Sequence, residues 1–409
     1  MLLTGRTVLE WTQDISGSFC ARVLGDLGAE VIKIESPHGG DPLRHAGPPR
    51  PGSAYGRSPL FGYLNHGKRS VTLDPSTPSG ARLFADLAAK ADILVETELS
   101  RGRAHESVSI ASLRAALRQL VVISITPFGL EGGPPSSPMT LQHRAGYAFH
   151  EASPVTDPVS QPPVGCTDNE GPLAIGVAAA VSAMYGLLSL KSDEPAPHID
   201  LAKFDFYATQ LYPGPLGEWS EGRRVFDRNR NNFGGTEVAG GLVWILQCSD
   251  GWIICSPREQ HQWDRWMKVL GDPPWSTDVA LCGDRAIRKA NFMQLQELMS
   301  VETGRMTRAE IFKAAREGHV ACLPVNYPAD LLRTEQLVAR EFFDHLSDPG
   351  QASIVIPGLP FRLQSGGEAL TRNRQVQSPE LGEANWEMLA GKLDLDAGQM
   401  QKLMNSRVI

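Results

Sequence analysis

Short apolar runs alternate with amphipathic stretches along the N-terminal part of the chain. Strands with apolar residues on both faces, separated by helices, are typical of a parallel sheet that helices cover on both sides. We expect strands at Thr7–Thr12, Val31–Glu35, Ser70–Asp74, Asp92–Glu96 and Val121–Thr126, and helices at Phe19–Leu27, Pro78–Ala91 and Ser112–Leu120. The pattern predicts a doubly wound α/β fold.

Two segments of this part lack such periodicity. Residues 36–66 are rich in Pro, Gly and Arg and are expected to form a long loop, and residues 127–163 are expected to be irregular. Long loops are uncommon in compact domains unless they serve a function. Leu173–Leu190 contains no charged residue and is nearly long enough to cross a membrane. Its Gly, Ala and Ser residues are more typical of a helix buried in a protein core, which is what we expect.

The second half changes character after a segment rich in Gly, Arg and Asn. We expect a large domain that begins with residues 1–215, a linker at 216–240, a small α/β domain at 241–330, and a return of residues 331–409 to the large domain. This division agrees with the length of 409 residues, because single cores usually split beyond about 250–300 residues. Further expected segments are the strands His198–Leu201, Leu242–Cys248, Trp252–Ser256, Ile354–Ile356 and Pro360–Leu363, and the helices Trp263–Leu270 and Arg308–Ala315.

Charge and cysteine spacing exclude several classes of protein. The net charge of −7 argues against nucleic acid as the main partner. The six cysteines form neither a C-x-x-C pair nor a zinc-binding spacing, and they are expected to be reduced thiols of a cytoplasmic protein that binds no metal. The N-terminus lacks the pattern of a secretion signal. The sequence contains no G-x-G-x-x-G after its first strand, no P-loop, no H-E-x-x-H and no G-x-S-x-G.

The motifs that are present resemble those of the family III CoA-transferases, the group of formyl-CoA transferase-like and CaiB/BaiF proteins. The resemblance extends along nearly the whole chain, and its blocks occur in the order expected for the family. They are Leu24-Gly25-Asp26-Leu27-Gly28-Ala29-Glu30-Val31-Ile32-Lys33-Ile34-Glu35, Gly39-Gly40-Asp41-Pro42-Leu43-Arg44, Asn65-His66-Gly67-Lys68-Arg69-Ser70-Val71-Thr72-Leu73-Asp74, Pro324-Val325-Asn326 and Pro357-Gly358-Leu359-Pro360.

The resemblance implies a Rossmann-like large domain made from both chain ends, a smaller inserted α/β domain, and an interlocked homodimer. It also implies an activity: CoA moves from an acyl-CoA to a small organic acid through covalent aspartyl intermediates. In this family an aspartate just before a long apolar helix is the nucleophile, and the position falls here on Asp168. A carboxylate can divide one difficult exchange into two easier ones. Taken alone, an aspartate at this position is more typical of a cap for the helix or for a turn.

Other residues are implied as contacts of CoA, which acts as the substrate thioester. These predicted CoA contacts are Asp14, Ile15, Ser16, Arg44, Lys68, Arg69, Leu73, Thr97 and Arg103. The cations suit phosphate groups, although Lys68 and Arg69 could also be a solvated pair at the start of a strand. Gly234, Gly235, Gly240 and Gly241 fall where the family has a glycine-rich loop that closes over its site, and they could instead belong to a simple linker.

Two departures from the family pattern bear on the reaction. Glu96-Thr97-Glu98 replaces the usual Glu-Asn-Phe, so the CoA contacts of that motif do not transfer directly. Pro138 stands where the racemase branch of the family needs a histidine, and proline cannot move an α-proton. Isomerisation or racemisation is therefore disfavoured, and a non-catalytic subunit of a hetero-oligomeric CoA-transferase is a further alternative. The sequence does not identify the donor and acceptor acids.

Overall fold

The computed structural model describes residues 1–47, 58–97, 108–150, 169–210, 220, 234–238, 241–347, 353–362, 364–365, 368–369 and 375–409. The chain divides into two compact units. The large unit comprises the described residues of Met1–Ala148, Gly165–Tyr212 and Glu341–Ile409, and the small unit those of Phe149–Val164 and Pro213–Arg340.

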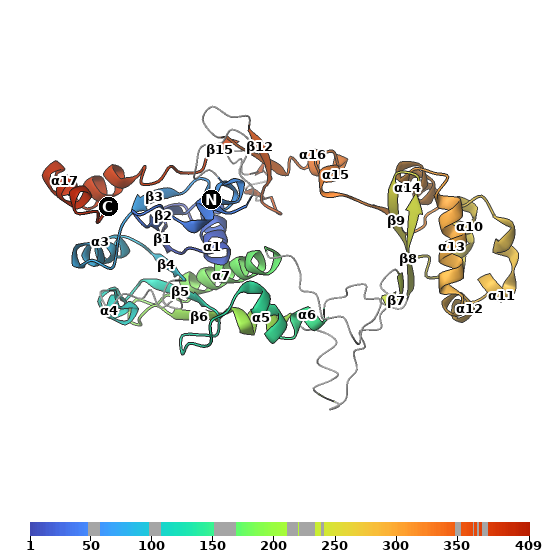
Figure 1. Ribbon diagram of the computed structural model, residues 1–409, viewed down its shortest axis with the longest axis horizontal. Helices are drawn as coiled ribbons and strands as arrows, with labels where there is room; N and C mark the ends of the chain where they lie inside the picture. Colours follow the sequence, from blue (N-terminus) through green and yellow to red (C-terminus); the bar gives the residue numbers. More distant parts are fainter. Residues whose placement is uncertain are drawn as a thin grey trace. The chain divides into compact units, whose positions relative to one another are not determined.

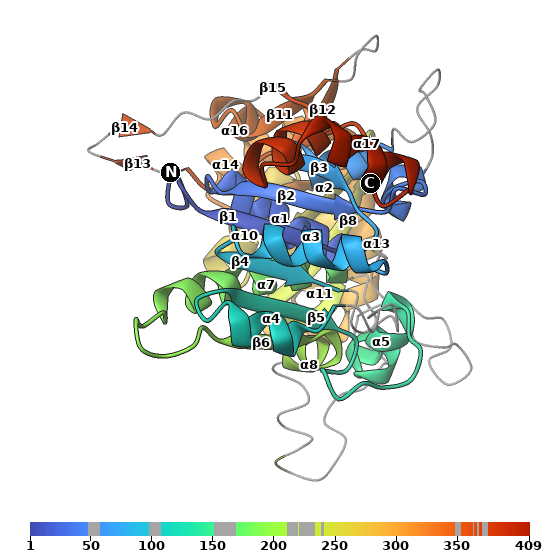
Figure 2. The same cartoon turned by 90° about the vertical axis from the view of Figure 1, so that its left-hand side faces the viewer.

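A six-stranded parallel sheet forms the centre of the large unit. Its strands are β1 (Thr7–Trp11), β2 (Glu30–Glu35), β3 (Arg69–Thr72), β4 (Ile93–Glu96), β5 (Val121–Thr126) and β6 (His198–Ala202). They lie in the order β3-β2-β1-β4-β5-β6, which Figure 2 shows across the sheet. This is the order of doubly wound nucleotide-binding folds, in which ligands bind beyond the carboxyl ends of the strands. The predicted parallel α/β sheet is confirmed.

Helices cover both faces of this sheet (Figure 1). One face packs against α3 (Pro78–Ala88), α4 (Ile110–Ala116), the π-helical segment η4 (Trp386–Lys392) and α17 (Ala397–Asn405). The other packs against α1 (Ile15–Asp26), α5 (Pro138–Arg144), α7 (Glu170–Leu188) and α8 (Lys203–Thr209). The strands read as continuous apolar runs because side chains on both faces are buried.

Several sequence predictions of local structure were wrong. The segment 36–66 is not one long loop, because it contains η1 (Pro42–His45) and α2 (Pro59–Asn65). The segment 127–163 contains α5 and α6 (Tyr147–His150). Helices α2 and α5 both begin with a serine cap followed by proline, and proline at the first helical position needs no N–H partner.

The apolar helix α7 is only partly buried. Its length and composition would allow it to cross a membrane, and among the described residues it is the one helix of that kind. Small residues such as Gly176, Ala179 and Ala183 face α1 and the sheet, as in the core helix of a globular protein. Val181 and Leu188 on the opposite side are 64% and 84% exposed, so the helix expected to be buried in the core is buried on one side only.

The C-terminal segment completes the core of the large unit. Strand β11 (Phe343–Leu346) pairs with β12 (Ile354–Pro357) and β15 (Gln375–Val376), and β13 (Gln364–Ser365) pairs with β14 (Glu368–Ala369). Residues 360–362 are not a strand, contrary to prediction. Met388 and Met400 then pack into the same core as α3, and the carbonyl of Val408 accepts a hydrogen bond from the Asp74 N–H at 2.8 Å.

The small unit contains a four-stranded antiparallel sheet and a set of helices. Its strands, in spatial order, are β10 (Cys322–Val325), β9 (Gly251–Cys255), β8 (Gly241–Cys248) and β7 (Gly234–Val238). Its helices are α10 (Gln260–Val269), η3 (Pro274–Thr277), α11 (Val279–Cys282), α12 (Arg285–Ala290), α13 (Phe292–Thr303), α14 (Arg308–Glu317), α15 (Pro328–Leu331) and α16 (Glu335–Ala339). Trp244, Trp263 and Trp266 are fully buried at its centre.

Candidate active site

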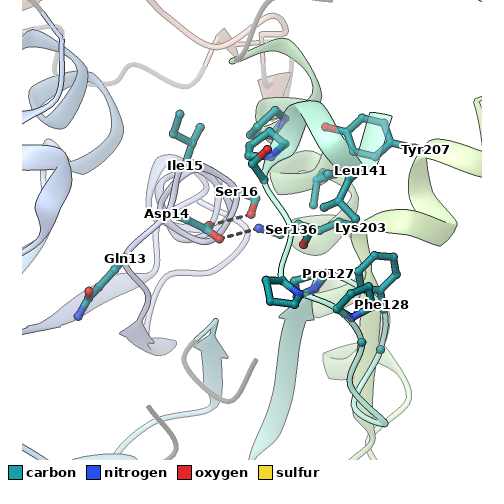
Figure 3. A pocket seen from close by; sticks show the side chains of 18 of the residues that line it. Gln13, Asp14, Ile15, Ser16, Pro127, Phe128, Ser136, Leu141, Lys203 and Tyr207 are labelled. Atoms are coloured by element: carbon teal, nitrogen blue, oxygen red, sulfur yellow. Dashed lines mark hydrogen bonds and ion pairs between the residues drawn. The ribbon is translucent and has the colours of Figure 1, made fainter. Parts of the chain in front are cut away.

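A cavity of about 830 Å³ opens in the large unit beyond the carboxyl ends of β1 and β5. Most of its wall comes from the turn from β1 into α1, the segment from β5 into α5, and the N-terminal parts of α7 and α8 (Figure 3), and Leu43 of η1 completes it. The volume is within the range of small-molecule sites. The cavity therefore lies where a doubly wound sheet binds its ligands.

The β1–α1 turn is held by Asp14. Its Oδ1 accepts hydrogen bonds from the Gly17 N–H at 2.9 Å and from the Ser16 hydroxyl at 2.8 Å, which caps α1. Its Oδ2 lies 2.6 Å from Nζ of Lys203, the first residue of α8 (Figure 3). One carboxylate thus fixes the start of α1 and ties it to α8.

Glycines allow the helices around the cavity to approach closely. A Cβ at Gly176 would lie 2.8 Å from the backbone oxygen of Ser16, so α7 meets the first turn of α1 with almost no space between them. A Cβ at Gly171 would overlap with Oη of Tyr207. The first turn of α7 is therefore held directly against the cavity wall.

Beneath α1 lies a fully buried charge cluster, defined as Glu10, Lys33, Glu35, Asp41, Arg44 and Lys68. Lys33 Nζ lies 2.7 Å from Glu10 Oε1 and 2.8 Å from Asp41 Oδ2. Lys68 Nζ lies 2.7 Å from Glu10 Oε2. Arg44 binds both oxygens of Glu35, each at 2.7 Å. Three carboxylates and three cations compensate one another, as buried charges must.

Two effects shift the pKa values in the buried charge cluster: burial, which disfavours the charged form of each group, and attraction or repulsion by the neighbouring charges. Burial raises the pKa of Glu10, but attraction to Lys33 and Lys68 outweighs it and the pKa is lowered. Burial lowers the pKa of Lys33, and its neighbouring carboxylates more than reverse this, so its pKa is raised. Burial lowers the pKa of Lys68 to about 8. Repulsion by Lys33 acts in the same direction, and attraction to Glu10 and Asp41 offsets only part of the effect. Of the two lysines in the cluster, Lys68 therefore loses its proton first as the pH rises.

The predicted CoA contacts divide into groups in the structure. Asp14, Ile15 and Ser16 line the cavity. Thr97 is buried beside them, and its hydroxyl accepts a long hydrogen bond of 3.4 Å from the Gln13 N–H. These residues meet at the carboxyl ends of β1 and β4.

The other predicted contacts in the described chain lie apart from this cavity. Arg44 and Lys68 turn inward into the buried charge cluster. Leu73 is a core residue. Arg69 is half exposed, lies 3.5 Å from Glu387 and lines a separate cavity of about 600 Å³.

The remaining predicted site residues lie outside the described chain or in strands of the small unit. Asp168, Arg103 and Gly240 lie outside the described residues. Gly234 and Gly235 belong to strand β7 of the small unit, and Gly241 begins strand β8. Strand β7 falls within the range 216–240 for which a linker was expected.

Sequence reasoning did not single out Lys203 or Tyr207, which line the cavity. A signal was present in the sequence, because Lys203 directly follows a strand that pairs in the parallel sheet. Residues at that position reach the ligand-binding edge. The sequence did not reveal that Lys203 forms an ion pair with Asp14, because the two residues are far apart along the chain.

Comparisons with known proteins agree with this geometry. The model of CoA-transferase family III matches residues 3–385. The succinate–glutarate CoA-transferase of Agrobacterium fabrum is 26% identical over 395 residues, 95% of each chain. The alpha subunit of succinyl-CoA–L-malate CoA-transferase from Chloroflexus aurantiacus is 26% identical over 415 residues, 100% of this chain and 92% of that one.

A solved structure is similar along almost the whole chain. The crystal structure of a CaiB/BaiF family protein from Brucella suis has a TM-score of 0.80 and 26% identity, covering 95% of this chain and 99% of that one. The resemblance inferred from the sequence motifs is confirmed, as is the enzyme class, CoA transfer. The chain belongs to CoA-transferase family III.

Proposed function

We propose that this chain transfers CoA from an acyl-CoA to a carboxylic acid through covalent intermediates on Asp168. The supporting observation is the position of α7, whose residues Pro172 and Ile175 line the cavity. The chain enters this helix through Asn169, whose side chain makes no capping hydrogen bond. Asp168 is covalently linked to this helix start, where backbone N–H groups favour negative charge.

The reaction consists of four substitutions at carbonyl carbon. The Asp168 carboxylate attacks the donor thioester, the C–S bond breaks, and a mixed anhydride and CoA thiolate form. The thiolate attacks the aspartyl carbonyl, which releases the donor acid and leaves an aspartyl-CoA thioester. The acceptor carboxylate then attacks this thioester, and the returning thiolate takes the acceptor acyl group and frees Asp168. No net proton or phosphate is consumed.

The contacts of CoA are proposed from the described geometry. Asp14, Ile15 and Ser16 meet the thioester end, because they line the cavity. Arg69 remains a candidate for CoA phosphates because its side chain is 48% exposed. For Arg44 and Lys68 we propose a positioning role, since their charges are satisfied inside the protein. These two cations stabilise the loop and strand that flank α1.

The proposed domain layout and assembly follow the family. The two compact units support a large domain formed by both chain ends and a small domain between them. The exposed apolar side of α7, with Val181 and Leu188, supports burial of this helix in an interlocked homodimer. Light scattering after gel filtration measures the assembly directly. The described cysteines are free and buried, which supports a cytoplasmic location.

An intermediate-trapping experiment tests the mechanism. The purified protein is incubated with a panel of acyl-CoAs and acids, and new thioesters are identified by mass spectrometry. Hydroxylamine added during turnover should convert Asp168 to a hydroxamate, which peptide mapping locates. Asp168→Ala should abolish transfer and leave CoA binding intact, whereas Asp193→Asn, at an exposed carboxylate, should retain transfer. Turnover by Asp168→Ala would remove Asp168 from the mechanism.

The same experiment distinguishes the alternatives. Solvent deuterium at the α-carbon without an added acid would indicate isomerisation, and neither transfer nor exchange would indicate a subunit that needs a partner. Pro138 begins α5 and lines the cavity. Because its ring carries no ionisable group, the site as described favours transfer over α-proton exchange.

A further inference from the structure

Lys203 places a positive charge in the wall of the cavity. Among the described residues that line it, Lys203 is the single cation and Asp14 the single anion. Both side chains are largely buried, with 17% and 18% of their surface exposed. Figure 3 shows the two in contact at the cavity, between the start of α1 and the start of α8.

The ion pair with Asp14 leaves Lys203 able to bind a ligand. An ammonium group has three N–H donors, and the described chain offers Lys203 one polar partner, Oδ2 of Asp14. The other oxygen of Asp14 accepts from Gly17 and Ser16 at the start of α1, where the helix stabilises negative charge. Asp14 thus interacts with both the start of α1 and Lys203, and two of the ammonium donors of Lys203 have no partner among the described residues.

The apolar lining of the cavity favours binding of a carboxylate over an uncharged group at Lys203. Pro127, Phe128, Leu141 and Ile175 give it apolar walls. A carboxylate in such surroundings is costly unless it meets a cation with hydrogen bonds to give. A substrate with an uncharged tail would instead leave the donors of Lys203 without a partner.

We propose that Lys203 binds the carboxylate of the substrate that is remote from the reacting carbonyl, and so selects short dicarboxylic acids and their CoA monothioesters. This proposal rests on the transfer reaction proposed above. The remote carboxylate takes no part in bond making. In a transfer of this kind, donor acyl group and acceptor acid occupy the same cavity in turn, so one lysine serves both half-reactions.

The test compares acids that differ only in the second carboxylate. Butyryl-CoA, which has no free acyl carboxylate, is the donor, and glutarate or valerate is the acceptor. Acyl-CoA products are quantified by chromatography for the wild type, Lys203→Met, Lys203→Gln and Lys203→Arg. Lys191→Met is the matched control, because Lys191 also pairs with a carboxylate at 2.8 Å but is exposed on the surface.

The expected result is a loss confined to the dicarboxylate. A charge-assisted contact of ordinary strength predicts a fall of about 10- to 100-fold in kcat/KM for glutarate in Lys203→Met and Lys203→Gln. The kcat/KM for valerate should not fall, since valerate makes no contact with Lys203 and the substitution removes donors that it leaves unpaired. Lys203→Arg should retain most of the activity with glutarate, and Lys191→Met all of it. Lys203→Gln keeps a donor for Asp14, which covers the case in which Lys203→Met does not fold.

A binding measurement separates this inference from the transfer mechanism. Calorimetric titration of the wild type should show tighter binding of glutarate than of valerate, and Lys203→Gln should remove the difference. An equal loss of kcat/KM for both acids, or a preference for glutarate that survives in Lys203→Gln, would overturn the role of Lys203. If no acid accepts CoA although binding follows the expected pattern, the transfer mechanism fails and the carboxylate site stands.

Discussion

Replacing Lys33 by methionine tests whether the buried charge cluster holds the N-terminal half of the large unit together. The Lys33 side chain is fully buried, and its Nζ bridges Glu10 at 2.7 Å and Asp41 at 2.8 Å. It also donates to the Thr12 carbonyl at 3.2 Å, directly before the turn that begins the cavity. Methionine has nearly the same length but cannot compensate either carboxylate.

The size of the stability loss in Lys33→Met depends on the carboxylates that stay buried without Lys33. Removing one member of a buried ion pair costs about 3–5 kcal/mol, because an uncompensated charge stays in the interior. Glu10 keeps its ion pair with Lys68, whereas the substitution removes the ammonium group that lies 2.8 Å from Asp41. We therefore expect Lys33→Met to lower the free energy of unfolding by about 3–5 kcal/mol, which corresponds to a fall in Tm of about 6–20 °C for a unit of this size.

The pH dependence identifies the cause of the loss. In the wild type, folding lowers the pKa of the Glu10 carboxyl below its ordinary value of 4.5. The ionised carboxylate therefore contributes fully to the free energy of unfolding above pH 4.5, and this contribution is lost as the pH falls through the lowered pKa. In Lys33→Met one of its two cations is gone, so Glu10 takes up a proton at higher pH. The stability gap between wild type and Lys33→Met should therefore narrow as the pH falls from about 7 to about 5.

Thermal and urea unfolding followed by circular dichroism provide the measurement. Lys191→Met, which breaks an exposed pair with Glu194, should change stability by less than about 1 kcal/mol. A loss of under about 1 kcal/mol in Lys33→Met, or a gap that widens toward acid, would show that charge compensation at Lys33 does not hold this core.

Two further predictions concern the same region. Since burial lowers the pKa of Lys68 to about 8 from an ordinary 10.5, the folded state binds fewer protons than the unfolded state between these values. The stability advantage of the wild type over Lys68→Met should accordingly grow between about pH 7 and about pH 9.5 in urea titrations, and a constant difference would contradict the assigned pKa. Gly176→Val should cost about 1–3 kcal/mol and reduce transfer, because its Cβ would lie 2.8 Å from the Ser16 oxygen. Val177→Ile, at a 46% exposed neighbour, should retain both stability and transfer; equal behaviour of the two variants would show that the α1–α7 contact is not tight.

The sheet was predictable because its strands are marked by local composition. The expected strand Val121–Thr126 coincides with β5, and Thr7–Thr12 differs from β1 by one residue. Helix α1 begins at Ile15, earlier than the expected Phe19. Its first turn contains serines and Gly17, residues that are typical of turns, and the cap by Asp14 decides the start.

The site was less predictable because its interactions join distant parts of the chain. Lys68 was assigned to CoA phosphates, but its partner Glu10 is 58 residues away, and only the fold brings the two together. The pair Lys203–Asp14 spans 189 residues in the same way. Resemblance to a family supplied Asp168, for which local composition alone offers no more than a capping role.

Residues 388–408 pack into the same core as strand β1 near the start of the chain. Met388, Met400 and Val408 cover Phe84 on one face of the parallel sheet. During synthesis on the ribosome, this apolar face of the sheet therefore stays exposed until residues 388–408 have emerged, and the partly made chain is prone to aggregation in that interval.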